Sequence, residues 1–175
     1  MNKYIKEKGF YRIILNGKRG GEALVDLMDY EKVKDISWSK NTLGYVTGSK
    51  DYRYVYLHRY ILRVPEDKRA DHINHDTLDN RRSNLRIVTT SQNNMNKKKQ
   101  SNNTSDIVGV SYVAKEWFGK DKNGNDLFRS PHWRANININ GKRISLGRFK
   151  KKEDAIAARK KAEDKYFGEY KYIPS

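Results

Sequence analysis

The chain of 175 residues contains no cysteine, which excludes disulfide bonds and thiolate zinc sites. It also has no apolar run of membrane-spanning length, and its first residues lack the apolar core of a signal peptide. A cytoplasmic location is therefore the expectation, and no membrane partner is predicted.

Apolar residues are scarce, at 36% of the chain against 33% for charged residues. A single compact domain of this length needs a larger apolar core than this composition readily supplies. Two small domains with a large wet surface fit better. The fold class that we expect is α+β.

Acidic residues are too few to balance the basic ones, because 37 Lys and Arg stand against 21 Asp and Glu, a formal net charge of +16. The excess is +6 in residues 1–93, +3 in 94–105 and +7 in 106–175. Positive charge along the whole chain indicates a long polyanion that is contacted at several places. Nucleic acid fits better than a membrane surface, because no basic amphipathic helix with a broad apolar face is present. The remaining alternative is a basic protein that its charge keeps soluble.

The clearest boundary is the segment 94–105, which has one apolar residue, no aromatic residue and a run of lysines. This composition is typical of a basic linker, either free in solution or lying along DNA phosphates. It separates a domain at 1–93 from one at 106–175. In the first domain the sequence predicts strands at 10–15 and 22–27, a helix at 28–36 capped by Asp29, a hairpin at 38–49 with Gly44 near its turn, and a strand that runs into a helix at 52–62.

The second domain shows alternating residues and turn signals. Residues 107–113 and 133–140 are predicted strands, and Asn140-Gly141 is a strong hairpin signal before a third strand at 142–149. A helix is predicted at 152–168. One face of that helix carries Ala155, Ala158, Ala162 and Tyr166.

The stretch from Asp71 to Asn94 combines an Asp-His pair with five asparagines and several arginines. Phosphodiester hydrolysis needs a base that deprotonates water and a hard cation that neutralises charge on the phosphate. Asp71 offers an oxygen ligand to such a cation, and His72 offers an imidazole that titrates near neutrality. Adjacent strand residues point to opposite faces, so a bend or bulge is expected where both reach one site.

The phrases DH, SNLR and QNN, in that order and preceded by LHR, resemble the HNH nucleases, specifically the phage-type homing endonucleases in their H-N-N variant. The resemblance implies a ββα-metal fold at about residues 69–97, with strands at 69–73 and 85–89 and a helix capped by Thr90 or Ser91. It implies one divalent metal ion, magnesium or manganese, and no small-molecule cofactor. The implied roles are metal ligands at Asp71 and Asn93 (with Asn94 as the alternative to Asn93), a general base at His72, and a support for the His72 ring at Asn84.

Basic residues around this stretch are interpreted as site or DNA contacts. His58 is placed with the catalytic residues and Arg59 with the DNA contacts, although phosphate contact and support of the site both stay open for this LHR phrase. His75 is interpreted as facing solvent or DNA. Phosphate contacts are also expected from Arg81, Arg82 and Arg86, with plain solubility charges as the alternative.

The phrases GVSY, WRANININGKRISLGRF and EDAIAARKKAEDKYFGEY resemble the AP2 DNA-binding domain. That family places a three-stranded antiparallel sheet in the major groove of double-stranded DNA, with one helix packed behind it. The implied DNA contacts are Tyr112, Trp133, Arg134, Asn136, Arg143 and Arg148. Strand alternation makes Trp133 a candidate for the core and puts Arg134 with Asn136 on the polar face, where an arginine can bind guanine bidentately. The segment 116–132 is longer than the family's usual first hairpin turn.

These observations together predict a metal-dependent endonuclease that recognises a DNA site. A monomer with one active site is expected to nick one strand. The role of a phage or mobile-element homing enzyme, in the cytoplasm of a bacterial host, follows from the resemblance alone. Two alternatives stay open: a DNA-binding protein without catalysis, and a homodimeric nuclease that makes double-strand breaks.

Overall fold

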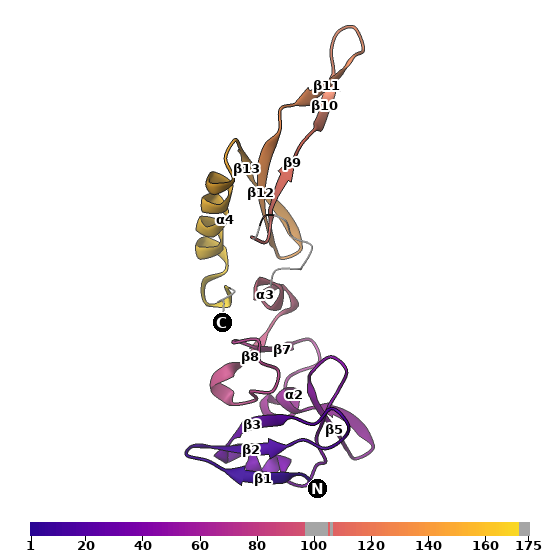
Figure 1. Ribbon diagram of the computed structural model, residues 1–175, viewed down its shortest axis with the longest axis vertical. Coiled ribbons are helices and arrows are strands. Elements are labelled where there is room, and N and C mark those ends of the chain that lie inside the picture. Colours follow the sequence, from indigo (N-terminus) through magenta and orange to yellow (C-terminus); the bar gives the residue numbers. More distant parts are fainter. Residues whose placement is uncertain (97–104, 106, 172–175) are drawn as a thin grey trace. The chain divides into compact units, whose positions relative to one another are not determined.

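In the computed structural model, residues 1–96, 105 and 107–171 are described. They divide into two compact units, of which the first ends at Asn93 and the second begins at Asn94 (Figure 1). Within the described residues, every helix is too short or too polar to cross a membrane.

Two antiparallel three-stranded sheets form the frame of the first unit. One is the meander β1 (Lys3–Lys6), β2 (Phe10–Ile14) and β3 (Glu22–Asp26), and the other consists of β4 (Ser39–Lys40), β5 (Val46–Lys50) and β6 (Arg53–Tyr56). The sequence pattern does not predict β1, because three of its four side chains are exposed and no apolar alternation marks it.

The helix expected at 28–36 is shorter than its sequence pattern suggests. It consists of the 3-10 turn η1 (Leu27–Asp29) and the single-turn helix α1 (Tyr30–Val33). Asp29 does not cap this helix, because its side chain makes no capping hydrogen bond. Instead, Asp29 is fully buried and ion-paired.

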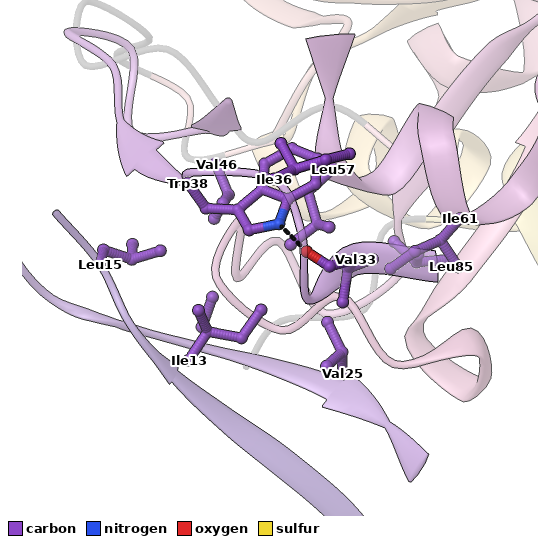
Figure 2. Packing of buried hydrophobic residues seen from close by; sticks show 11 residues of the cluster. Ile13, Leu15, Val25, Val33, Ile36, Trp38, Val46, Leu57, Ile61 and Leu85 are labelled. Atoms are coloured by element: carbon purple, nitrogen blue, oxygen red, sulfur yellow. Dashed lines mark hydrogen bonds between the residues drawn. The ribbon is translucent and has the colours of Figure 1, made fainter. Parts of the chain in front are cut away.

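The core of the first unit gathers aliphatic side chains from both sheets around Trp38 (Figure 2). The indole is fully buried, and its Nε1 donates a hydrogen bond of 2.9 Å to the carbonyl oxygen of Val33. Burying such a ring removes a large apolar area from water while the N–H keeps a partner. Leu57 and Ile61 join this core from α2 (Leu57–Leu62), and Leu85 joins it from β8 (Leu85–Val88).

The candidate site lies in the last part of the first unit. A two-stranded antiparallel ribbon pairs β7 (Arg69–His72) with β8, and the 3-10 turn η2 (Arg82–Asn84) and helix α3 (Thr90–Met95) flank β8. This β–β–α order agrees with the one that the HNH resemblance implies. The loop at 73–81 is fastened to β3, because Asn80 N–H donates to Leu24 O at 2.8 Å and Leu24 N–H donates to Leu78 O at 2.9 Å.

The second unit contains one sheet, one ribbon and one long helix (Figure 1). The sheet has the order β13 (Lys142–Phe149), β12 (His132–Ile139) and β9 (Val110–Val113), and α4 (Lys152–Tyr166) packs on one of its faces before the 3-10 turn η3 (Gly168–Tyr170). The long segment at 116–132 forms a separate ribbon of β10 (Glu116–Lys120) and β11 (Asp126–Arg129). The predicted Asn140-Gly141 turn joins β12 and β13, with φ of 48° and 78°.

One residue of the predicted helix face is placed wrongly by the sequence pattern. Ala155 and Ala162 are buried as expected, but Tyr166 is 39% exposed. Arg159 and Phe167 are buried instead. The Arg159 guanidinium keeps its hydrogen bonds inside the unit, because Nε donates to Glu163 Oε1 at 2.8 Å and Nη1 donates to the carbonyl oxygen of Asn136.

Candidate active site and nucleic-acid interface

Asp71 and His72 end strand β7, where the ribbon register is regular. Asp71 lies opposite Arg86 and His72 lies opposite Leu85, without the bulge that the sequence argument expected. Residues directly opposite in an antiparallel pair share a face, and adjacent residues do not. The carboxylate and the imidazole therefore leave opposite faces of the ribbon at its end.

The His72 imidazole is buried in a group of rings. Its centroid lies 4.9 Å from that of His58 and 6.1 Å from that of Tyr45. Burial lowers the pKa of His72 below its ordinary value, although Asn80 and nearby carboxylates act in the opposite direction. A lowered pKa keeps the imidazole neutral at pH 7, which is the form that accepts a proton.

The hydrogen bond between His72 and Asn80 assigns the proton on the His72 ring. Asn80 Nδ2 donates to the carbonyl oxygens of Thr77 (3.3 Å) and Leu78 (3.0 Å), so its Oδ1 is the atom that faces His72 Nε2 at 3.3 Å. Because Oδ1 only accepts, Nε2 carries the hydrogen and Nδ1 holds the basic lone pair. Sequence reasoning did not single out Asn80. The only feature of the sequence that could have pointed to Asn80 is that it is one of the five asparagines in the stretch from Asp71 to Asn94.

His58 supports the rings but stays uncharged. Its side chain is buried, and its Nδ1 has no hydrogen-bond partner within the described chain. Burial, followed by the influence of His72 and Arg59, lowers the pKa of His58 to about 3. Its ring lies between those of His72, which it meets edge to face, and Tyr56, whose centroid lies 5.6 Å away at a tilted angle. The structure therefore brings both predicted histidines together.

Asn84 is buried, but its amide holds the loop rather than the His72 ring. Nδ2 donates to the Asp79 carbonyl at 2.8 Å, and Oδ1 accepts from the backbone N–H of Asn74 at 2.9 Å. Its backbone carbonyl also accepts from Ile73 N–H at 2.9 Å. The expected contact with the imidazole is made by Asn80, and Asn84 fixes both ends of the loop that carries Asn80.

Asp71 is paired with a cation across the ribbon. Arg86 Nε donates to Asp71 Oδ2 at 2.9 Å, and Nη2 lies 2.8 Å from the same oxygen. Both side chains are largely buried, at 15% and 10% exposure. Arg86, which the sequence assigned to phosphate, thus contacts the predicted metal ligand.

Asn93 is half-buried on α3, and Thr89 rather than Thr90 or Ser91 caps this helix. Thr89 N–H donates to Gln92 Oε1 at 2.8 Å, and Gln92 N–H donates to Thr89 Oγ1 at 3.2 Å, which is a reciprocal capping box. The alternative ligand Asn94 is exposed on the same helix.

The donor chemistry of Asp71 and Asn93 fits a hard cation. One carboxylate and one amide oxygen are the ligand types that Mg²⁺ and Mn²⁺ prefer, and Mg²⁺ keeps several waters when the protein supplies few ligands. Across the described residues, no group of three His, Cys, Asp or Glu side chains gathers in a metal-binding arrangement. The assignment of a cation site therefore rests on the two oxygen donors, Asp71 and Asn93.

In a comparison with known proteins, residues 55–95 match the family model described as HNH endonuclease. This matched stretch is an HNH endonuclease domain. A protein of Acanthamoeba polyphaga mimivirus described as an uncharacterized HNH endonuclease is 34% identical over 105 residues, which cover 57% of this chain and 56% of that relative. The chain thus spans about half the length of this curated relative. No solved structure matches the chain.

The match confirms the HNH endonuclease domain that the phrases DH, SNLR and QNN predicted. It ends at residue 95, so the AP2-like assignment of residues 106–175 stays a prediction. The homing role and the bacterial host also stay predictions, because the relative is viral.

Three other arginines of the HNH domain that were expected at phosphates bind other parts of the protein. Arg82 binds the buried carboxylate of Asp29 bidentately, because Nε donates to Oδ2 and Nη2 donates to Oδ1, both at 2.8 Å. Arg81 does the same with Asp79, at 2.8 and 2.7 Å. Arg59 donates to the carbonyl oxygens of Val64, Pro65 and Lys68 in the loop after α2. Each guanidinium already has partners within the fold.

The residues of the second unit that were predicted to contact DNA lie on two different faces of its sheet. Tyr112 and Trp133 are cross-strand neighbours with ring centroids 5.3 Å apart. Trp133 packs on the core beneath α4, so both lie on the helix side. The opposite side, which we term the polar face, carries Ser111, Arg134, Asn136, Asn138, Arg143, Ser145 and Arg148. Tyr112, although 53% exposed, is thus separated from the arginines.

Proposed function

We propose that this chain is a metal-dependent endonuclease that hydrolyses one strand of double-stranded DNA. The observation that carries the proposal is the buried, neutral His72, which follows Asp71 in the sequence, in a β–β–α segment within the match to the HNH family. The net charge of +16 supports a polyanionic substrate.

In this proposal, Asp71 and Asn93 hold one divalent cation, Mg²⁺ or Mn²⁺. The bound cation supplies charge neutralisation at the phosphate and at the leaving oxygen. His72 Nδ1 takes the proton of the attacking water, because Asn80 keeps the other ring nitrogen protonated. Asn84 holds the loop in place, and His58 supports the ring without adding a second charge.

The second unit is proposed to locate the DNA site through its polar face. Arg134, Arg143 and Arg148 project from two neighbouring strands together with Asn136. This combination suits major-groove recognition, since arginine pairs with guanine and asparagine with adenine. It also corresponds to the AP2-like assignment. The narrow major groove of RNA does not admit such a sheet, so DNA is the preferred substrate.

Conversion of supercoiled plasmid in the presence of Mg²⁺ or Mn²⁺ tests the catalytic part. Wild-type chain should produce nicked circles, and His72→Ala should not, while both bind DNA equally in a chelator. Nicked product from His72→Ala at the wild-type rate contradicts the assigned base. Linear product from the wild type indicates the homodimeric nuclease instead of a nicking monomer.

Metal binding is tested separately by calorimetric titration with Mn²⁺. Asp71→Asn should abolish the binding heat. The matched control Asp67→Asn removes the same charge from an exposed carboxylate that is paired with Lys68, and it should bind Mn²⁺ as the wild type does. Equal loss in both variants contradicts the assignment of Asp71.

A second candidate function is a DNA-binding protein without catalysis. One observation favours it, which is that Arg86 already pairs with the proposed metal ligand. Absence of Mn²⁺ binding heat in the wild type, together with salt-sensitive DNA binding, establishes this alternative.

A further inference from the structure

Glu116, at the start of β10, is surrounded by three arginine cations and one histidine from the neighbouring strands. Arg148 Nε donates to its Oε2 at 3.0 Å, and Arg134 Nη2 lies 3.7 Å from Oε1. Arg129 Nε and His132 Nε2 lie 3.4 and 3.5 Å from Oε2. The carboxylate is 19% exposed. The neighbouring arginines, Arg148 first, hold the pKa of Glu116 below its ordinary value, so it is ionised near neutral pH.

Two of these cations belong to the polar face that is proposed to bind DNA. Arg134 and Arg148 are direct cross-strand partners on β12 and β13. Like charges in that relation repel each other, and the Glu116 carboxylate compensates them. A carboxylate between two guanidinium groups offers the same kind of oxygen acceptor as a DNA phosphate.

The position of Glu116 comes from the added ribbon. Glu116 pairs with Arg129 across β10 and β11, and β10 follows β9 of the three-stranded sheet after a two-residue connection. The segment 116–132 is the part of the unit that is longer than the usual AP2 hairpin. The extra ribbon therefore brings a negative charge to a face whose charged residues are otherwise all arginines.

We propose that Glu116 is a specificity-determining residue of the polar face. Its carboxylate takes the place of a phosphate oxygen beside Arg134 and Arg148, and it lowers the affinity of this face for DNA of mixed sequence. Binding then depends more strongly on base contacts, which a non-specific site does not provide. This inference rests on the proposed DNA binding by the second unit.

Fluorescence anisotropy with a mixed-sequence DNA duplex in a chelator provides the test, with full-length chain and a range of salt concentrations. Glu116→Gln frees a cation for one more phosphate contact. In about 0.1 M monovalent salt this should tighten binding about eightfold, and it should steepen the slope of log affinity against log salt by about 0.9.

Asp126→Asn is the matched control, because it removes the same charge from the same ribbon. Asp126 contacts Trp117 Nε1 at 3.0 Å and Lys120 Nζ at 3.7 Å. This variant should leave affinity and salt slope nearly unchanged. Equal tightening by both variants overturns the proposal, because total charge would then explain the effect. Weaker binding by a folded Glu116→Gln overturns it as well.

Arg143→Ala separates this inference from the proposed function. Arg143 lies on the polar face opposite Asn138, near the start of β13, whereas Arg148 lies near its end. Wild-type affinity in Arg143→Ala and Arg134→Ala refutes DNA binding by the face itself. Weaker binding in these variants without tightening by Glu116→Gln refutes only the role of Glu116.

A measurement on the wild type covers the case in which Glu116→Gln does not fold. The Arg148 Nε–H resonance, observed by nuclear magnetic resonance in isotope-labelled chain, should shift when duplex DNA replaces Glu116 as its partner. An unchanged resonance at saturating DNA overturns the proposal.

Discussion

Arg82→Ala should destabilise the first unit strongly, because Arg82 is bound to a buried carboxylate. Its guanidinium donates twice to Asp29 at 2.8 Å and once to Ile61 O at 3.1 Å, while Asp29 is fully buried. Removing one partner of a buried pair costs roughly 3–5 kcal/mol of unfolding free energy. Lys32 remains 3.1 Å from Asp29, and the arginine is 33% exposed, so we expect the lower end, about 3 kcal/mol.

Urea unfolding is the assay, followed by the fluorescence of Trp38 in a background with Trp117→Phe and Trp133→Phe. For a unit of this size, about 3 kcal/mol lowers the midpoint by about 2 M urea. The control is Arg12→Ala, whose pairs with Glu7 and Glu22 are exposed and therefore contribute little to stability.

A midpoint for Arg82→Ala no lower than that of Arg12→Ala refutes the reasoning. If Arg82→Ala weakens DNA binding and leaves stability unchanged, the result supports the phosphate contact that the sequence suggested for Arg82. A double-mutant cycle with Asp29→Asn adds a second check, since the two changes should couple by more than about 1 kcal/mol.

Three further predictions concern acid stability, the α3 cap and a crowded glycine. Burial opposes ionisation of Asp29, but hydrogen bonds from its cations outweigh this and lower its pKa. Ionised Asp29 therefore stabilises the folded unit above the unfolded pKa of about 4, and this stabilisation is lost as the pH falls further. The difference in urea midpoint between wild type and Asp29→Asn should accordingly shrink below about pH 4. Thr89→Ala should cost about 1 kcal/mol and speed amide exchange in α3 about fivefold, and unchanged exchange contradicts the cap. Gly109→Ala would place a Cβ 2.4 Å from Asn136 O at φ +80°, so it should destabilise the second unit by roughly 2 kcal/mol, and an unaltered melting temperature contradicts this.

Local patterns predicted the elements of the second unit well. The alternation at 133–140 corresponds to β12, and the Asn140-Gly141 turn lies where it was expected. These features depend on neighbours within a few residues, where side-chain period and turn preference decide the structure. The burial of Arg159 in the middle of α4 was missed, because its guanidinium contacts the carbonyl oxygen of Asn136 on a different element.

The partners of charged residues could not be predicted from the sequence. It shows that Arg82 is a cation, but its acceptor Asp29 lies 53 positions earlier in the chain. The same applies to the His72 ring, for which the nearer asparagine in sequence, Asn80, is the partner rather than Asn84. Spacing identified the motif, whereas the loop conformation determines which amide reaches the ring.

The Arg86–Asp71 pair also bears on how folding and metal loading are connected. In a zinc finger the metal supplies the folding free energy, and a chelator unfolds the domain. Here Arg86 neutralises the Asp71 carboxylate, so the ribbon can form without a metal ion, and the proposed cation would replace a guanidinium at a largely buried carboxylate. Under the proposed function, a chelator should inhibit cleavage reversibly and leave the melting temperature of the first unit nearly unchanged.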